Sequence, residues 1–355
     1  MGPGSAKRPA GMSLAEPRSM NLRTFEDIAV GETAETGALH VTQDETVAFA
    51  REFDPQPFHL DPEAAKHSML GGLAASGWHT AAMGMRLAYD GYVKDIDSWG
   101  GPGIEELKWL LPVRPGDTLG LRRQIMGKRV SKSRPEMGFV DTQLELFNQR
   151  RETVMTQRMF MMVGLRGAAR APMAEPVAKA AAAPAPATSA PDMPDHPLWF
   201  DDIALGTRRP IGPFQFTAEN IIRFAERYDP QPFHLSEEGA AKSHFGRLAA
   251  SGWHTGAVWM KLMIADRDRR DAVFRASGLE LPPPGPSPGF RNLRWIAPVH
   301  AGDTVTYDSV ISDKRASASR PGWGLVFFKN SGVNQHGVKV FSFDGSSFWA
   351  RRKGA

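Results

Sequence analysis

Two identical heptapeptides place a carboxylate and an imidazole at a spacing that suits acid–base chemistry on water. DPQPFHL occupies positions 54–60 and recurs at 229–235, so Asp54 and His59 are repeated as Asp229 and His234. Such a pair can hold and deprotonate a water molecule, because burial tunes the pKa values of both groups towards neutrality. One copy alone is more often a turn with a structural histidine. Two copies in matching surroundings favour a working site in at least one of them.

The surroundings of the two motifs are repeated as well. LAASGWHT at 73–80 recurs at 248–255 with the same interval, whereas SKSRP at 131–135 recurs as SASRP at 317–321 with a longer one. The second copy therefore contains extra residues, which fall between 265 and 290, where a Pro/Gly-rich stretch predicts an inserted loop. We therefore predict two homologous domains, joined by an Ala/Pro-rich linker and preceded by a tag or disordered N-terminus. Their boundaries are 1–21 for the N-terminus, 22–165 and 198–355 for the domains, and 166–197 for the linker.

Each copy needs the same elements to present its motif. A strand leads to a helix that starts at Thr42 or Thr217, since each threonine is followed by acids typical of a first helical turn. The two prolines of the motif then predict an irregular, non-helical loop that carries the Asp and the His. The next segment is apolar on most faces, which indicates a buried helix. The predicted strands are 34–41, 104–111, 118–130, 138–150 and 154–165 in the first copy and 208–216 in the second; the predicted buried helices are 77–87 and 252–264.

Composition excludes several other classes of protein. The chain of 355 residues contains no cysteine, which removes disulfides, thiolate nucleophiles, Cys-ligated zinc and iron–sulfur clusters. The net charge of +4 comes without a basic run interleaved with aromatic residues, so no nucleic-acid partner is expected. No apolar stretch approaches the length of a membrane span, and no acid or His cluster has metal-ligand spacing. We predict no membrane contact, no metal and a cytoplasmic location, with an organellar matrix as the alternative.

The repeated residues resemble the MaoC-like hydratase/dehydratase family over nearly the whole chain. The resemblance rests on the Asp-to-His spacing, the glycine-led buried helix, and the PVxxGDT turns at 112–118 and 298–304. The sequence departs from the family at Gln56 and Gln231, where the family has Asn, and at Met85 and Met260, where well-known enoyl-thioester hydratases have Ser. The resemblance implies an α+β double hot-dog fold, in which each repeat wraps an antiparallel sheet around a long central helix. The two halves would pair within one chain, and further homo-oligomers are left open.

The resemblance also implies reversible addition of water to trans-2-enoyl-CoA, giving (R)-3-hydroxyacyl-CoA, with no cofactor beyond the coenzyme A of the substrate. It assigns catalysis to Asp54, His59, Asp229 and His234, and assigns stabilisation of the thioester oxygen to the backbone N–H groups of Gly77 and Gly252. Two complete sites per chain are expected. An acyl-CoA thioesterase and a non-catalytic acyl-CoA-binding protein remain the alternatives. Further substrate-binding candidates are Gln56, Gln231, Ser76, Ser251, His79, His254, Arg134 and Arg320; the two arginines would meet CoA phosphates unless they only shape a hairpin.

Overall fold

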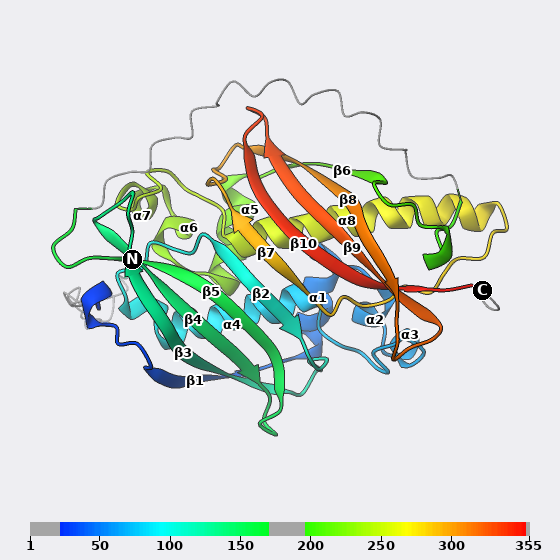
Figure 1. Ribbon diagram of the computed structural model, residues 1–355, viewed down its shortest axis with the longest axis horizontal. Helices are drawn as coiled ribbons and strands as arrows, with labels where there is room; N and C mark the ends of the chain where they lie inside the picture. The colour runs from blue at the N-terminus through cyan, green and yellow to red at the C-terminus, as the bar shows by residue number, and fades with distance from the viewer. Residues whose placement is uncertain (1–21, 170–195, 353–355) are drawn as a thin grey trace, which may run out of the picture.

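The computed structural model describes residues 22–169, here called the first repeat, and 196–352, the second repeat (Figure 1). The expected N-terminal segment 1–21 and most of the expected linker lie outside the described residues. The first repeat contains β1 (Thr33–His40), α1 (Gln43–Phe53), α2 (Pro57–Leu60), α3 (Pro62–Lys66), α4 (Gly77–Gly91), β2 (Gly103–Trp109), β3 (Thr118–Val130), β4 (Met137–Phe147) and β5 (Thr153–Gly164). The second contains β6 (Arg208–Gln215), α5 (Ala218–Tyr228), α6 (Pro232–Leu235), α7 (Glu237–Ala241), α8 (Gly252–Ala276), β7 (Gly289–Trp295), β8 (Thr304–Ala316), β9 (Trp323–Asn334) and β10 (Lys339–Ala350).

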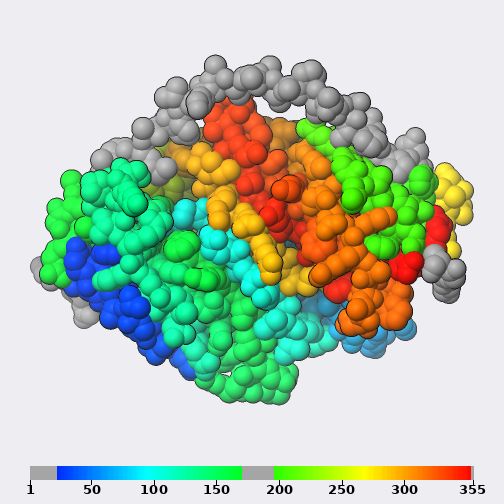
Figure 2. Space-filling model, in the orientation of Figure 1, coloured from blue at the N-terminus to red at the C-terminus, as the bar shows by residue number. Residues whose placement is uncertain are grey.

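The strands of both repeats form one continuous sheet. Within the described residues its order is β1-β3-β4-β5-β2-β7-β10-β9-β8-β6, so the second repeat mirrors the first about the β2–β7 junction. The two junction strands are antiparallel, with Gly103 opposite Arg294 and Lys108 opposite Gly289. Both glycines have positive φ, and a side chain at either one would collide with a carbonyl of the opposing strand. The colours of the two repeats meet along the β2–β7 junction on the face shown in Figure 2.

The central helices α4 and α8 pack behind the sheet in the view of Figure 1 and share one hydrophobic core. Trp78 of α4 lies at the centre of the contact between the repeats. Its ring stacks on Phe290 of β7, with centroids 5.3 Å apart, and meets the edge of Trp253 of α8 at 6.4 Å. Because aromatic side chains bury the largest apolar areas, this cluster holds the two repeats together. Intramolecular pairing of the halves therefore agrees with the expectation from sequence.

Two local predictions were wrong. The second half of each DPQPFH motif is a short helix, α2 or α6, because Pro57 and Pro232 stand at its first position, where the missing N–H costs nothing. The inserted residues of the second repeat also do not form only a loop. They extend α8 to 25 residues, against 15 in α4, since the segment up to Ala276 lacks Pro and Gly. None of the helices in the described residues is long and apolar enough to cross a membrane.

Candidate active site

Asp54 is positioned by the end of α1 and the start of α2. Thr42 caps α1 by accepting a hydrogen bond from the N–H of Glu45, and the helix ends one residue before Asp54. The backbone at Asp54 leaves the helical region, with φ −151° and ψ 64°, and this break turns the carboxylate into the protein interior. The side chain is 1% exposed. Burial of a carboxylate requires partners, and three side chains supply them.

The carboxylate of Asp54 lies in a network of fixed donors. Gln56 Nε2 donates to Asp54 Oδ1 at 2.9 Å, and Ser76 Oγ donates to Asp54 Oδ2 at 2.6 Å. The Ser76 hydroxyl also accepts from the N–H of Trp78 as the N-cap of α4, so the position of the carboxylate is linked to the start of the central helix. These contacts make Gln56 and Ser76 positioning groups for Asp54, and their role as substrate ligands stays a prediction.

The imidazole of His59 faces the same carboxylate. Its Nδ1 lies 2.7 Å from the carbonyl oxygen of Ala74, and because a carbonyl only accepts, Nδ1 must carry the proton of this hydrogen bond. His59 Nε2 then points towards Asp54 Oδ2 at 3.4 Å, which is long for a hydrogen bond. The nitrogen and the carboxylate can therefore both contact one water molecule, as general base catalysis requires.

The N-terminus of α4 supplies a donor beside this pair. Gly77 is the first residue of the helix, and its N–H has no hydrogen-bond partner within the described part of the chain. A free N–H at a helix N-terminus can stabilise a developing oxyanion. The glycine itself is required by packing, because a Cβ at this position would lie 2.6 Å from the ring of Trp109.

A cavity of about 830 Å³ opens at Asp54, His59 and Gly77. Its other walls belong largely to the second repeat: the inner face of β8, β9 and β10, the far half of α8, and the loop 281–288. Arg267 of α8 crosses from this wall to the site, where its Nη1 donates to Gln56 Oε1 at 2.8 Å. The first-repeat site is therefore completed by a residue of the second repeat.

The second repeat reproduces the arrangement of side chains around Asp229. Gln231 Nε2 donates to its Oδ1 at 2.9 Å, Ser251 Oγ donates to its Oδ2 at 2.6 Å, and His234 Nε2 lies 3.5 Å from its Oδ2. His234 Nδ1 lies 2.7 Å from the carbonyl oxygen of Ala249. Burial lowers the pKa of His234, and the charge of Asp229 opposes this effect. Each motif, with its neighbouring residues, thus folds to the same local geometry.

The remaining four substrate-binding candidates differ in their surroundings. His79 and His254 do not line the cavity: His79 stacks on Phe49 with ring centroids 4.5 Å apart, and His254 stacks on Phe224 at 4.7 Å. Both rings pack within the helix layer, and their role as substrate ligands stays a prediction. The two hairpin arginines differ. Arg320 is exposed and lines the cavity, whereas Arg134 donates to Glu136 at 2.7 Å and is no part of the lining.

Sequence analysis missed Arg267 because no repeated motif contains it. The residue lies in the inserted half of α8, which has no counterpart in the first repeat. The cavity itself was missed for a similar reason, since its walls come from segments far apart in the chain. One signal was present: the inserted stretch DRDRR at 266–270 is dense in arginine, and a charged face on a buried central helix needs an explanation.

Both repeats are similar to known proteins. The model of the MaoC-like domain matches the chain twice, at residues 26–145 and 205–321. The chain belongs to the MaoC-like domain family. A solved MaoC domain protein, described as a dehydratase from Chloroflexus aurantiacus, superposes with a TM-score of 0.73 over 95% of this chain and 100% of its own, at 18% identity. The protein Rv0216 of Mycobacterium tuberculosis, described as a double hot-dog fold, superposes with a TM-score of 0.60 over 92% of this chain and 98% of its own, at 15% identity. These two matches and the sheet order confirm the double hot-dog fold.

Two curated relatives match single repeats of this MaoC-like chain. The uncharacterized protein YdeM of Bacillus subtilis is 29% identical over 140 residues, which cover 39% of this chain and 97% of YdeM. The 3-hydroxybutyryl-CoA dehydratase of Methylorubrum extorquens is 30% identical over 109 residues, which cover 30% of this chain and 60% of that enzyme.

Proposed function

We propose that this protein is an acyl-thioester hydratase or dehydratase, which interconverts trans-2-enoyl-CoA and (R)-3-hydroxyacyl-CoA. The observation that carries the proposal is the convergence of three groups on one wall of the cavity: the Asp54 carboxylate, His59 Nε2 and the N–H of Gly77. Membership of the MaoC-like family and the named dehydratase among its relatives support the same reaction.

In the hydration direction, Asp54 acts as the general base and His59 orients the water and shares in proton transfer. The proton leaves the water as its oxygen bonds to C3 of the enoyl group, and the electron pair of the double bond moves towards the thioester oxygen. The N–H of Gly77 donates to that oxygen, and a proton from the Asp54–His59 pair completes the addition at C2. General acid–base groups of this kind contribute about 10²–10⁴-fold to the rate.

The coenzyme A moiety needs cationic partners at the exposed part of the cavity. Arg275 and Arg320 line the cavity and are both exposed, and guanidinium groups pair well with phosphate. Replacement of Arg320 by Ala should raise the KM for an enoyl-CoA roughly tenfold, if one charge-assisted hydrogen bond is lost. Arg134→Ala is the matched control from the equivalent hairpin, and its KM should stay near that of the wild type.

The test of the reaction measures loss of the enoyl-thioester absorbance with crotonyl-CoA and trans-2-octenoyl-CoA. Wild-type protein should hydrate at least one of them, and Asp54→Asn should lower kcat by about 100-fold or more. Free thiol should not be released. Release of thiol with no change in the enoyl absorbance would replace the proposal by the thioesterase alternative, and binding without either reaction would leave a non-catalytic acyl-CoA-binding protein.

A further inference from the structure

The two motifs have the same internal geometry, but their surroundings differ. Corresponding hydrogen bonds to Asp54 and Asp229 agree in length, and both carboxylates are buried. The lining of the 830 Å³ cavity nevertheless includes Asp54 and His59, and includes neither Asp229 nor His234. The difference must therefore arise from what packs over each motif.

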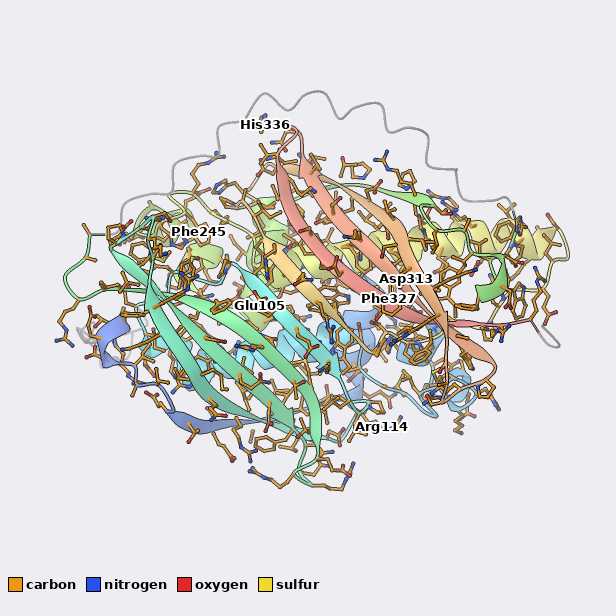
Figure 3. The ribbon with its side chains drawn as sticks, viewed as in Figure 1. Glu105, Arg114, Phe245, Asp313, Phe327 and His336 are labelled. Atoms are coloured by element: carbon orange, nitrogen blue, oxygen red, sulfur yellow. The ribbon has the colours of Figure 1, made fainter. Side chains whose placement is uncertain are left out.

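The second motif is covered by the connection between the central helix α4 and strand β2 of the first repeat. In the first repeat this connection is short, and Ser98 Oγ donates to Gln231 Oε1 at 3.1 Å. The next residue, Trp99, is 1% exposed and stacks on His244, with centroids 5.6 Å apart. Phe245, labelled in Figure 3, continues this layer and approaches the His234 ring at 6.1 Å.

The first motif, in contrast, is left open by the residues around it. Met69 and Leu70 stand at the positions equivalent to His244 and Phe245, and both line the cavity. The longer connection of the second repeat runs through ten further helical residues and the proline-rich loop 281–288, which form the cavity wall. Gln56 receives its hydrogen bond from the Arg267 guanidinium of that wall, whereas the equivalent Gln231 receives one from the Ser98 hydroxyl.

Side-chain size on the inner face of the sheet separates the repeats in the same way. Met137 pairs with Gly164 in the first repeat as Trp323 pairs with Ala350 in the second, so β5 and β10 can be compared residue by residue. Met159 and Met161 of β5 correspond to Gly345 and Ser347 of β10, which lie on the same face as Phe343. Gly345 and Ser347 line the cavity, whereas Met161 is buried in the core of the first repeat and Met159 packs against that core.

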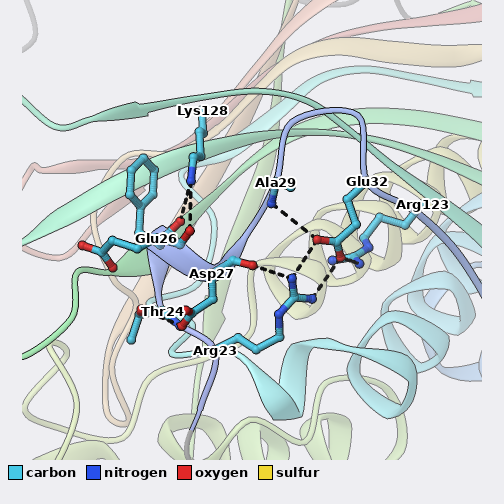
Figure 4. A network of polar contacts seen from close by, with 9 residues as sticks. Arg23, Thr24, Glu26, Asp27, Ala29, Glu32, Arg123 and Lys128 are labelled. Carbon is cyan, nitrogen blue, oxygen red and sulfur yellow. Dashed lines mark hydrogen bonds and ion pairs between the residues drawn. The ribbon is translucent and has the colours of Figure 1, made fainter.

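A buried arginine also occupies space in the first repeat that is equivalent to part of the cavity. Arg123 of β3 is 3% exposed; it lies over the ring of Tyr92, 4.6 Å from the centroid, and donates to Glu32 (Figure 4). Glu32 also accepts from Arg23, so the network is anchored on both sides. The equivalent residue on β8 is Ser309, which lines the cavity instead.

We propose that each chain has one working site, at Asp54 and His59, and that the second repeat serves it as the wall of the substrate cavity. The Asp229 motif keeps its hydrogen bonds because they hold α5, α6 and α8 together, not because a substrate reaches it. Duplication has thus been followed by a division of labour, in which the catalytic groups come from one repeat and the space for substrate from the other.

The first experiment compares kcat of wild type, Asp54→Asn, Asp229→Asn and the double variant, with trans-2-octenoyl-CoA and the full chain. Asp54→Asn should match the double variant, about 100-fold or more below wild type, and Asp229→Asn should keep the full wild-type kcat. Two equal and independent sites would instead leave about half the activity in each single variant, and that result would overturn the inference. Circular dichroism and melting curves check that each variant is folded.

The second experiment does not depend on turnover, because this inference rests on the proposed function only for its activity readout. Binding of the saturated probe octanoyl-CoA, measured by titration calorimetry, should saturate at one molecule per chain; a stoichiometry of two would refute the single open site. If wild type binds one octanoyl-CoA but hydrates no enoyl-CoA, the proposed function fails and the single site stands.

A filling variant tests the role of the second repeat. Ser347→Met introduces the residue found at the equivalent position of β5, and should weaken octanoyl-CoA binding roughly tenfold through loss of space for about two methylene groups. Met161→Leu is the matched control, because it conserves volume at the equivalent position of β5, which does not line the cavity. Equal affinities of wild type and Ser347→Met would exclude the second repeat as the cavity wall for this substrate.

Discussion

His254 should make the stability of the protein depend on pH. The imidazole is fully buried between Phe224 and Phe216, and its Nδ1 has no hydrogen-bond partner in the described residues. This desolvation, with smaller contributions from the cationic side chains of Arg223 and Lys261, lowers the pKa of His254 from 6.5 to about 3. The folded protein therefore keeps this ring neutral down to about pH 3.

The size and sign of the effect follow from these two values. At pH 7 the folded chain binds no proton at His254 and the unfolded chain binds about a quarter of one, so the pKa shift costs only about 0.2 kcal/mol. As the pH falls below 6.5 the unfolded chain binds the proton and the folded chain does not, so stability is lost progressively down to about pH 3. Between pH 7 and pH 5 the free energy of unfolding should fall by about 2 kcal/mol on account of this residue.

The assay is urea unfolding of wild type and His254→Leu, followed by tryptophan fluorescence at pH 7 and pH 5. The leucine variant should lose about 2 kcal/mol less than wild type over this interval, because it removes the buried titratable group. His336→Gln at the exposed tip of the β9–β10 hairpin (Figure 3) is the control, and should retain the wild-type pH dependence. Identical pH dependences for wild type and His254→Leu would refute the reasoning.

Two further predictions concern packing and charge. Gly77→Ala should destabilise the protein by about 1–3 kcal/mol in thermal unfolding, because the new Cβ would overlap the Trp109 ring. Gly84→Ala in the same helix is the control. Its Cβ would meet only the flexible end of a methionine, so it should change stability by less than about 1 kcal/mol. Arg209→Met should cost about 1–3 kcal/mol in the same measurement, because Asp266, which is 4% exposed, loses its partner at 2.6 Å but keeps Arg269 at 2.6 Å and Arg270 at 3.3 Å. Arg209→Met combined with Asp266→Leu should recover most of this loss, and no recovery would contradict the assignment.

Much of the local structure could be predicted from the sequence. The repeated motif identified Asp54 and His59 together with the helix that begins at Gly77, because short-range rules govern caps, proline positions and apolar periodicity. The strand at 118–130 was located to the residue. The same rules misjudged the motif's second half, where proline at the first helical position starts a helix instead of preventing one.

The sequence by itself determined that the chain is a duplication, that each copy carries an Asp–His motif, and that each copy forms a sheet around a central helix. These features depend on residues close together in the chain. Only the tertiary structure decided which motif adjoins a cavity, because the decisive residues lie far from both motifs. Arg267 and Ser347 form the wall for a site in the other repeat, and Trp99 covers the second motif from the first repeat. Two identical motifs cannot indicate such differences, because the access of substrate to a motif depends on how the repeats pack together.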